Sequence, residues 1–176
     1  LITLIIIIKF LEGNNKKKTE IEKIEENVYS SNIIKGVKYS SVDLNGNVYI
    51  ITASTGEIDF KNTDIIFLQD VKALIILKDD DEITITSKFG KYNITNFDTI
   101  FSKNVVVNYL DNKINGEYLD SSFERNSLII SKNVVYKNEK NILNADVVEI
   151  DIKTKDTKIF MYEIDKKVNI KSINQN

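Results

Sequence analysis

Four consecutive carboxylates form the densest group of side chains in this sequence that could bind a metal ion or carry out acid–base chemistry. Asp79, Asp80, Asp81 and Glu82 offer the oxygen ligands that Ca²⁺ prefers. The four residues are contiguous, however, and they lack the spaced ligands and the central glycine of a calcium-binding loop. This pattern is typical of a solvated turn between two strands, and the sequence predicts no metal site.

Nucleophilic catalysis has few possible participants, because the chain contains no histidine and no cysteine. Ser87, Ser121 and Ser122 therefore lack the imidazole base of a Ser-His-Asp arrangement, and no thiolate is present to act as a nucleophile or metal ligand. Paired carboxylates remain open as the machinery of an enzyme acting on carbohydrate or lipid. The sequence favours a protein that is not an enzyme and binds no cofactor.

Phosphate and nucleic-acid binding find equally little support. The formal net charge is −2 and Arg125 is the sole arginine, so no basic patch for nucleic acid is predicted. Gly46, Gly56, Gly90 and Gly116 fall at strand starts or in turns and do not form one phosphate-binding loop. Backbone geometry is the simpler explanation of these glycines.

Three of the glycines mark a repeat that organises the chain. Gly90 is followed by a short alternating run, a polar turn, an apolar pair at 100–101, a polar break at 103–104 and a run of valines from Val105. The same order follows Gly56, and the interval from Gly to Val is identical in the two copies, from 56 to 71 and from 90 to 105. The interval that starts at Gly116 is longer and ends at 134, which predicts an insertion of three in the turn. A single unit cannot bury its apolar face, so neighbouring units must stack.

Short alternating segments continue from Ile33 to Ile164. Ile, Val, Thr, Tyr and Phe dominate the apolar set, which favours strands over helices. The pair Asn45-Gly46 predicts a tight hairpin, because both residues tolerate positive φ. These signals predict an all-β fold. A sandwich, a jelly roll and a roll-like solenoid of repeated short antiparallel strands are all compatible with them, and the repeat favours the roll.

The segments before Ile33 have a different character. Residues 1–11 are almost wholly apolar but reach only about half the length of a membrane-spanning helix. Since the sequence begins with Leu, we interpret this run as the C-terminal part of a transmembrane anchor, with a buried strand as the alternative. Residues 12–32 are predicted to form a charged linker with a possible short helix. Residues 16–18 are lysines, and positive charge beside a membrane-spanning segment usually stays on the cytoplasmic side. Residues 33–172 form the β domain, and 173–176 are a polar tail.

The interior of a roll this size either fills with side chains or leaves a groove for an apolar ligand. Phe67 and Phe101 follow their glycines at the same interval, and Ile130 matches them once the insertion is allowed. Equivalent positions in stacked repeats share a face, so these three residues are expected to form an interior stripe. The residues predicted to line such a groove are Ile58, Phe60, Phe67, Val71, Tyr92, Ile94, Phe101, Val105, Ile130 and Val134.

The order of anchor, charged linker and β-repeat resembles the LptC family, the inner-membrane component of the lipopolysaccharide export bridge. The segments that carry the resemblance are YSSVDLNGNVYIITASTGEIDF at 39–60, DIIFLQDVKA at 64–73 and ADVVEIDIKTKDTKIF at 145–160. The same diffuse pattern is similar to the related periplasmic LptA and OstA-type domains. The resemblance covers Ile33 to Ile164.

The resemblance implies a twisted β-jellyroll whose open apolar groove carries the acyl chains of lipopolysaccharide. Its N-terminal edge would meet the permease subunits of an ABC transporter, and its C-terminal edge an LptA-like periplasmic bridge protein. It further implies a sensitive turn at Gly46 and a lipid-facing aromatic at Phe67. The protein would sit in the inner membrane of a Gram-negative bacterium by a single pass, with the β domain in the periplasm. The residues expected at the partner edge are Ile159, Phe160, Met161, Tyr162 and Ile164. The alternative is a structural or adhesive β-repeat protein with a filled core and no ligand.

Overall fold

The computed structural model describes residues 33–163 and 165–173. The predicted anchor, the predicted linker and Ile164 lie outside the described residues. The regular secondary structure of these described residues consists of strands alone. The strands are β1 (Ile33–Val42), β2 (Val48–Ile58), β3 (Ile65–Ile76), β4 (Glu82–Asn93), β5 (Thr99–Tyr109), β6 (Asn112–Ser122), β7 (Ser127–Lys137), β8 (Asn141–Asp151), β9 (Thr157–Phe160) and β10 (Asn169–Ser172).

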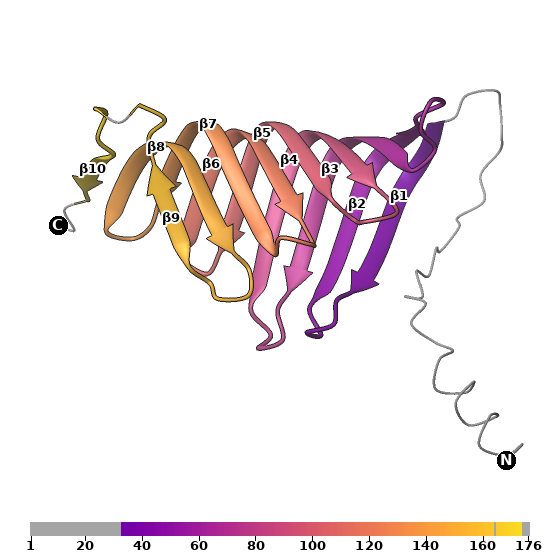
Figure 1. Ribbon diagram of the computed structural model, residues 1–176, viewed down its shortest axis with the longest axis horizontal. Coiled ribbons are helices and arrows are strands. Elements are labelled where there is room, and N and C mark those ends of the chain that lie inside the picture. The colour runs from indigo at the N-terminus through magenta and orange to yellow at the C-terminus, as the bar shows by residue number, and fades with distance from the viewer. Residues whose placement is uncertain (1–32, 164, 174–176) are drawn as a thin grey trace, which may run out of the picture.

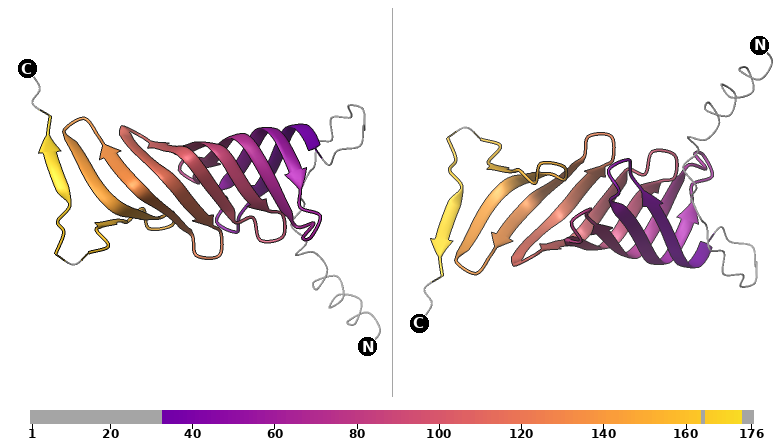
Figure 2. Two further views of the ribbon diagram at one scale, coloured as in Figure 1. Left: turned by 90° about the horizontal axis from the view of Figure 1, so that it is seen from above. Right: turned by 90° about the horizontal axis from the view of Figure 1, so that it is seen from below.

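The strands form one continuous antiparallel sheet (Figure 1). β1 to β8 pair in chain order, as a meander. β9 then pairs with residues 147–150 of β8, and β10 pairs with residues 141–144 of the same strand. Seen from above and from below, the strands cross the long axis of the molecule diagonally, with β1 at one end and β10 at the other (Figure 2). The prediction of an all-β antiparallel fold is confirmed.

Each long strand bends once, and the bend folds the sheet over on itself. On the odd-numbered strands the bend falls at residues with left-handed backbone: Asp70 in β3, Lys103 and Asn104 in β5, and Lys132 and Asn133 in β7. The pairing register shifts at the same places in β5 and β7, as expected of β-bulges, which bend a strand and increase its twist. The polar breaks of the repeat are therefore bends within continuous strands, with bulges in β5 and β7 and a left-handed residue without a register shift in β3. We call the line of these bends the crease.

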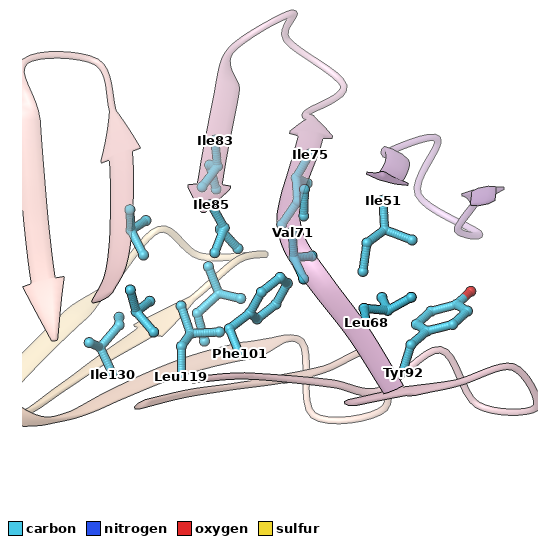
Figure 3. Close-up of a cluster of buried hydrophobic side chains, with 14 of the residues drawn as sticks. Ile51, Leu68, Val71, Ile75, Ile83, Ile85, Tyr92, Phe101, Leu119 and Ile130 are labelled. Atoms are coloured by element: carbon cyan, nitrogen blue, oxygen red, sulfur yellow. The ribbon is translucent and has the colours of Figure 1, made fainter. Parts of the chain in front are cut away.

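The core is built from two rows of residues that are paired between adjacent strands, with one row on each side of the crease. The first row consists of Leu68, Gly90, Phe101, Leu119, Ile130 and Val148. The second row consists of Ile51, Ala73, Ile85, Val107, Ile114 and Tyr136. The two halves of the folded sheet direct these side chains toward one another (Figure 3). Burial is nearly complete in the middle, where Phe101 is 2% exposed and Leu119 and Ile130 are 0% exposed.

The first row corrects the predicted repeat. Gly116 pairs with Val105 and lies outside the row in which Gly90 stands. Leu119 takes the equivalent place in β6, and the interval from Leu119 to Val134 equals the interval from Gly90 to Val105. The loop between β6 and β7, at 123–126, is also shorter than the loop between β4 and β5, at 94–98. The expected insertion in the turn is therefore wrong, and the repeat is regular.

The expected interior stripe is also wrong for Phe67. Leu68 is the β3 residue opposite Gly90, so Leu68 matches Phe101. Leu68 precedes Val71 by three positions, whereas Phe101 precedes Val105 by four. The reason is that β3 bends at the single left-handed residue Asp70 without a register shift, while β5 bends at a bulge with two left-handed residues. The shorter bend cancels one extra residue between Gly56 and Leu68, so the Gly-to-Val interval stays constant. A one-residue offset reverses the face of a strand residue, and Phe67 points outward with 45% of its surface exposed.

The loop that contains Gly46 is longer than a tight hairpin. β1 and β2 are joined by the loop 43–47. One Oδ atom of Asp43 accepts hydrogen bonds from the backbone amides of Asn45 (2.8 Å) and Asn47 (2.9 Å), and the other accepts from the side chains of Asn47 and Tyr49. Gly46 has φ +90°, a conformation that other residues rarely adopt. The sequence located the turn correctly, but the Asp43 network makes it wider than predicted.

Candidate functional site

The ten residues predicted to line a groove divide between the core, the outer face of the sheet and two loops. Six of them are 5% exposed or less and lie in the core: Val71, Tyr92, Phe101, Val105, Ile130 and Val134. Ile58 is partly buried and packs against this core. Phe60, Phe67 and Ile94 are 80%, 45% and 40% exposed. Most of the predicted residues therefore face the interior, but the middle of that interior is occupied by its own side chains.

The N-terminal half of the interior is filled by aromatic rings. Tyr39 stacks on Tyr92 with ring centroids 5.1 Å apart. Phe123 contacts both Tyr49, at 4.0 Å between centroids, and Phe97, at 5.6 Å. The space left among these side chains has a volume of about 30 Å³, roughly enough for a single water molecule. Burial in this apolar setting raises the pKa of Tyr92 and of Tyr39, so both phenols stay neutral.

The C-terminal half of the interior holds a cavity of about 330 Å³. The loop 77–81 and strands β4 to β7 contribute one wall, and β8, β9 and the loop 152–156 contribute the other. The cavity-lining residues are mainly apolar: Leu77, Ile83, Val107, Tyr109, Asn112, Ile114, Tyr136, Ile150, Asp151, Ile152, Lys155, Thr157 and Ile159. This volume falls within the range of small-molecule sites, and its lining suits an aliphatic chain.

One charged cluster lies at the rim of this cavity. The Lys155 ammonium donates hydrogen bonds to Asp79 and, at 3.4 Å, to Asp81. The hydroxyl of Tyr109 donates to the same carboxylate of Asp81 at 3.0 Å. The hydrogen bond from Lys155 lowers the pKa of Asp79, and the hydrogen bond to Asp79 raises the pKa of Lys155, so both groups are charged near neutral pH.

The other candidates for chemistry have structural roles. Among the described residues, no group of three or more carboxylates is placed to hold a metal ion. Two members of the acidic cluster pair with Lys155, as described above. The Ser87 hydroxyl donates to the carbonyl oxygen of Phe89 at 2.8 Å, and Arg125 pairs with Asp120 at 2.9 Å. These contacts stabilise strands and turns.

The two ends of the sheet present different edges. Among the described strands, β1 pairs only with β2, so no described strand covers its outer edge. At the other end, β8 is covered by the short strands β9 and β10. Of the residues predicted for the partner edge, Ile159 and Phe160 belong to β9, whereas Met161 and Tyr162 follow it. The described residues include no helix long and apolar enough to cross a bilayer.

Sequence reasoning missed the C-terminal cavity and its rim. Lys155 lies 76 residues from Asp79 along the chain, and no local motif connects the two. Ile150 and Ile152 fall within the alternating segments, and alternation alone does not show which residues line a cavity.

An antiparallel meander folded over along a crease, with an apolar interior and two unclosed ends, defines the class of open β-jellyroll modules. The chain belongs to the LptC family: the family described as lipopolysaccharide-assembly, LptC-related, matches residues 1–159. The structure is similar to that of LptH, the LptA-homologous periplasmic component of the lipopolysaccharide transport device of Pseudomonas aeruginosa, with a TM-score of 0.53 and 10% identity. The similarity covers 73% of this chain and 95% of that one, and it shows the shared fold. No curated protein matches the chain.

The resemblance to the LptC family is confirmed. Membership supports a role in the lipopolysaccharide transport bridge, as a non-enzymatic component. It also supports a periplasmic position of the β domain in a Gram-negative bacterium.

Proposed function

We propose that this protein binds the acyl chains of lipopolysaccharide inside its β-roll and passes the lipid from the transporter permeases to a periplasmic bridge protein. The observation that carries the proposal is the cavity of about 330 Å³ beneath the last strands. Its apolar walls come from both halves of the folded sheet, and it lies at the end of the roll where the next module would follow. Binding a chain there requires no catalytic group and no cofactor.

The proposal can be tested by placing a photo-reactive side chain at one position at a time. Ile150 and Ile159 line the cavity, whereas Phe67 of β3 points outward from the sheet and is the matched control. In cells with an active transporter, the two cavity positions should form lipopolysaccharide adducts and Phe67 should not. Adducts at all three positions would indicate surface contact only, and adducts at none would refute the function.

The filled middle of the roll favours one other function. Phe101, Leu119 and Ile130 leave almost no space between the two halves of the sheet. A structural or adhesive β-repeat protein without a ligand would have such an interior throughout. Absence of adducts in the photo-crosslinking experiment would favour this second function.

The partner at the C-terminal end would add a strand to the outer edge of β9, since edge strands offer unpaired backbone groups. A chain truncated after Thr157 loses most of β9 and all of β10 but keeps β8. Binding of an LptA-like bridge protein in a pull-down should then be lost, while circular dichroism still reports the β fold. Equal or stronger binding would show that the partner pairs with β8 directly. By the same reasoning, we assign the outer edge of β1 to the permeases.

We also propose that residues 1–11 belong to a single inner-membrane anchor. Deleting them should release the β domain into the soluble periplasmic fraction with its circular dichroism unchanged. Loss of the β signal on deletion would indicate a buried strand instead.

A further inference from the structure

The two halves of the folded sheet end in two sets of loops that face each other across a seam. One rim of the seam comprises the loops 43–47, 77–81, 110–111 and 138–140, and the other comprises 59–64, 94–98, 123–126 and 152–156. The loops 77–81 and 152–156 both reach the lower edge of the view in Figure 1, and the contact between Asp79 and Lys155 brings them side by side.

Hydrogen bonds along each rim connect neighbouring loops. On one rim, the amide of Lys78 donates to the side chain of Asn47 at 3.0 Å. On the other rim, the amide of Phe123 donates to Asp98 at 3.1 Å, and the amide of Ile152 donates to the carbonyl oxygen of Asn126 at 2.8 Å. These bonds tie adjacent loops within a rim, so a gap between the rims would open where the contacts across the seam are weakest.

The contacts across the seam differ between its two halves. In the N-terminal half, the rings of Tyr49 and Phe123 meet at 4.0 Å over a filled interior. In the C-terminal half, Lys155 reaches across the seam to Asp79 and Asp81, and the side chains of Lys155 and Asp79 are 41% and 54% exposed. An exposed ion pair is weak and is screened by salt, whereas an apolar contact between partly buried aromatic rings is not screened by salt.

Local structure presents Lys155 at this place. The Asp151 carboxylate accepts hydrogen bonds from the amides of Lys153 and Thr154, both at 2.8 Å, and the amide of Lys155 donates to the Asp151 carbonyl oxygen at 2.8 Å. Lys155 itself has φ +64°, so the loop turns sharply at the residue that spans the seam. Both Asp151 and Lys155 line the cavity.

We propose that the ion pairs of Lys155 with Asp79 and Asp81 form a latch, which controls the lateral passage of an aliphatic chain through the seam into the C-terminal cavity. This inference rests on the proposed function, because it takes the cavity to be the place that holds the chain. In the two loops and their flanks, six carboxylates (Asp79, Asp80, Asp81, Glu82, Asp151 and Asp156) outnumber four lysines (Lys78, Lys153, Lys155 and Lys158). The latch therefore acts as a closure and not as a receptor for an anionic head group.

The test measures how fast the full chain takes up the methyl ester of cis-parinaric acid, a neutral aliphatic chain with intrinsic fluorescence, by stopped flow. Lys155→Met keeps the length of an apolar stem but removes the charge, and it should speed uptake by roughly two- to fivefold, as expected for an exposed ion pair. Lys88→Met is the matched control, because it breaks the exposed Lys88–Asp70 pair away from the seam. Raising the salt concentration from about 0.01 M to about 1 M should speed uptake by the wild type but not by Lys155→Met.

A covalent closure provides the decisive comparison. The chain contains no cysteine, so the double variant Asp79→Cys, Lys155→Cys carries two unique thiols. Joining them with a short bis-maleimide should abolish uptake, whereas the same variant capped with N-ethylmaleimide should match Lys155→Met. Uptake that is equally fast in the linked and capped forms would show that chains enter by the end of the roll, which overturns the latch and leaves the lipid function standing. Uptake by no form, including the wild type, would overturn both.

Discussion

Truncating Phe101 and Phe67 separately tests the fold-over geometry on which the site depends. Phe101 is 2% exposed in the first row of the core, and Phe67 is 45% exposed on the outer face. A fully buried phenylalanine replaced by alanine loses its transfer free energy and leaves a cavity, at a combined cost of about 3–5 kcal/mol. The Phe67 side chain is only about half buried and borders solvent. Its truncation therefore leaves no enclosed cavity, and the loss in the free energy of unfolding should be about 1 kcal/mol.

Urea denaturation followed by circular dichroism measures both losses in the same protein. With an unchanged slope against urea, the difference in midpoint reports the difference in the free energy of unfolding. Phe101→Ala should lower the midpoint by several times as much as Phe67→Ala. Similar losses for the two variants would mean that Phe67 shares the interior with Phe101, as the constant Gly-to-Val spacing first suggested. The observed register of β3 would then be wrong by one residue.

Two further predictions concern backbone and charge. Gly116→Ala should destabilise the protein by about 1–3 kcal/mol in the same urea assay, because a Cβ there would lie 2.7 Å from Cγ2 of Ile130. Gly46→Ala places its Cβ where no atom lies within 4 Å, but φ of +90° should still cost about 1–2 kcal/mol. An unchanged urea midpoint in both variants would contradict the packing. Burial alone would raise the pKa of Asp43, but the hydrogen bonds from Asn47, Asn45 and Tyr49 outweigh burial and lower that pKa. The loop 43–47 should therefore lose stability as the pH falls through the depressed pKa of Asp43, below the ordinary value of 3.8. The protection of the Asn47 amide against exchange, followed by NMR, should fall in that pH range in the wild type and not in Asp43→Asn.

Alternation and composition predicted most of the fold. The run from Thr99 to Tyr109 alternates on each side of its bulge, and its inward residues are buried as a period of two requires. The pattern could not supply the number of residues that form the bend in each strand. Because one residue more or less at the bend reverses the face of a strand residue, Phe67 and Leu68 exchange faces without any change in composition. The cavity was equally hidden, because Lys155 and Asp79 meet only after the intervening strands have folded over.

The left-handed residues at the crease show why the polar breaks recur. Asp70, Lys103 and Lys132 have φ values of 52°, 63° and 66°, a conformation that costs a non-glycine residue roughly 1–2 kcal/mol. Each is tied on the outer face: Asp70 pairs with Lys88, and the ammonium groups of Lys103 and Lys132 lie over the rings of Phe89 and Tyr118 at 5.5 and 5.6 Å. Bending at these points turns both halves of every strand toward one interior, which a straight strand of the same sequence could not do. The strain is therefore offset by the second apolar surface that each bend brings into the core, and the polar break is as much a part of the repeat as the valines that follow it.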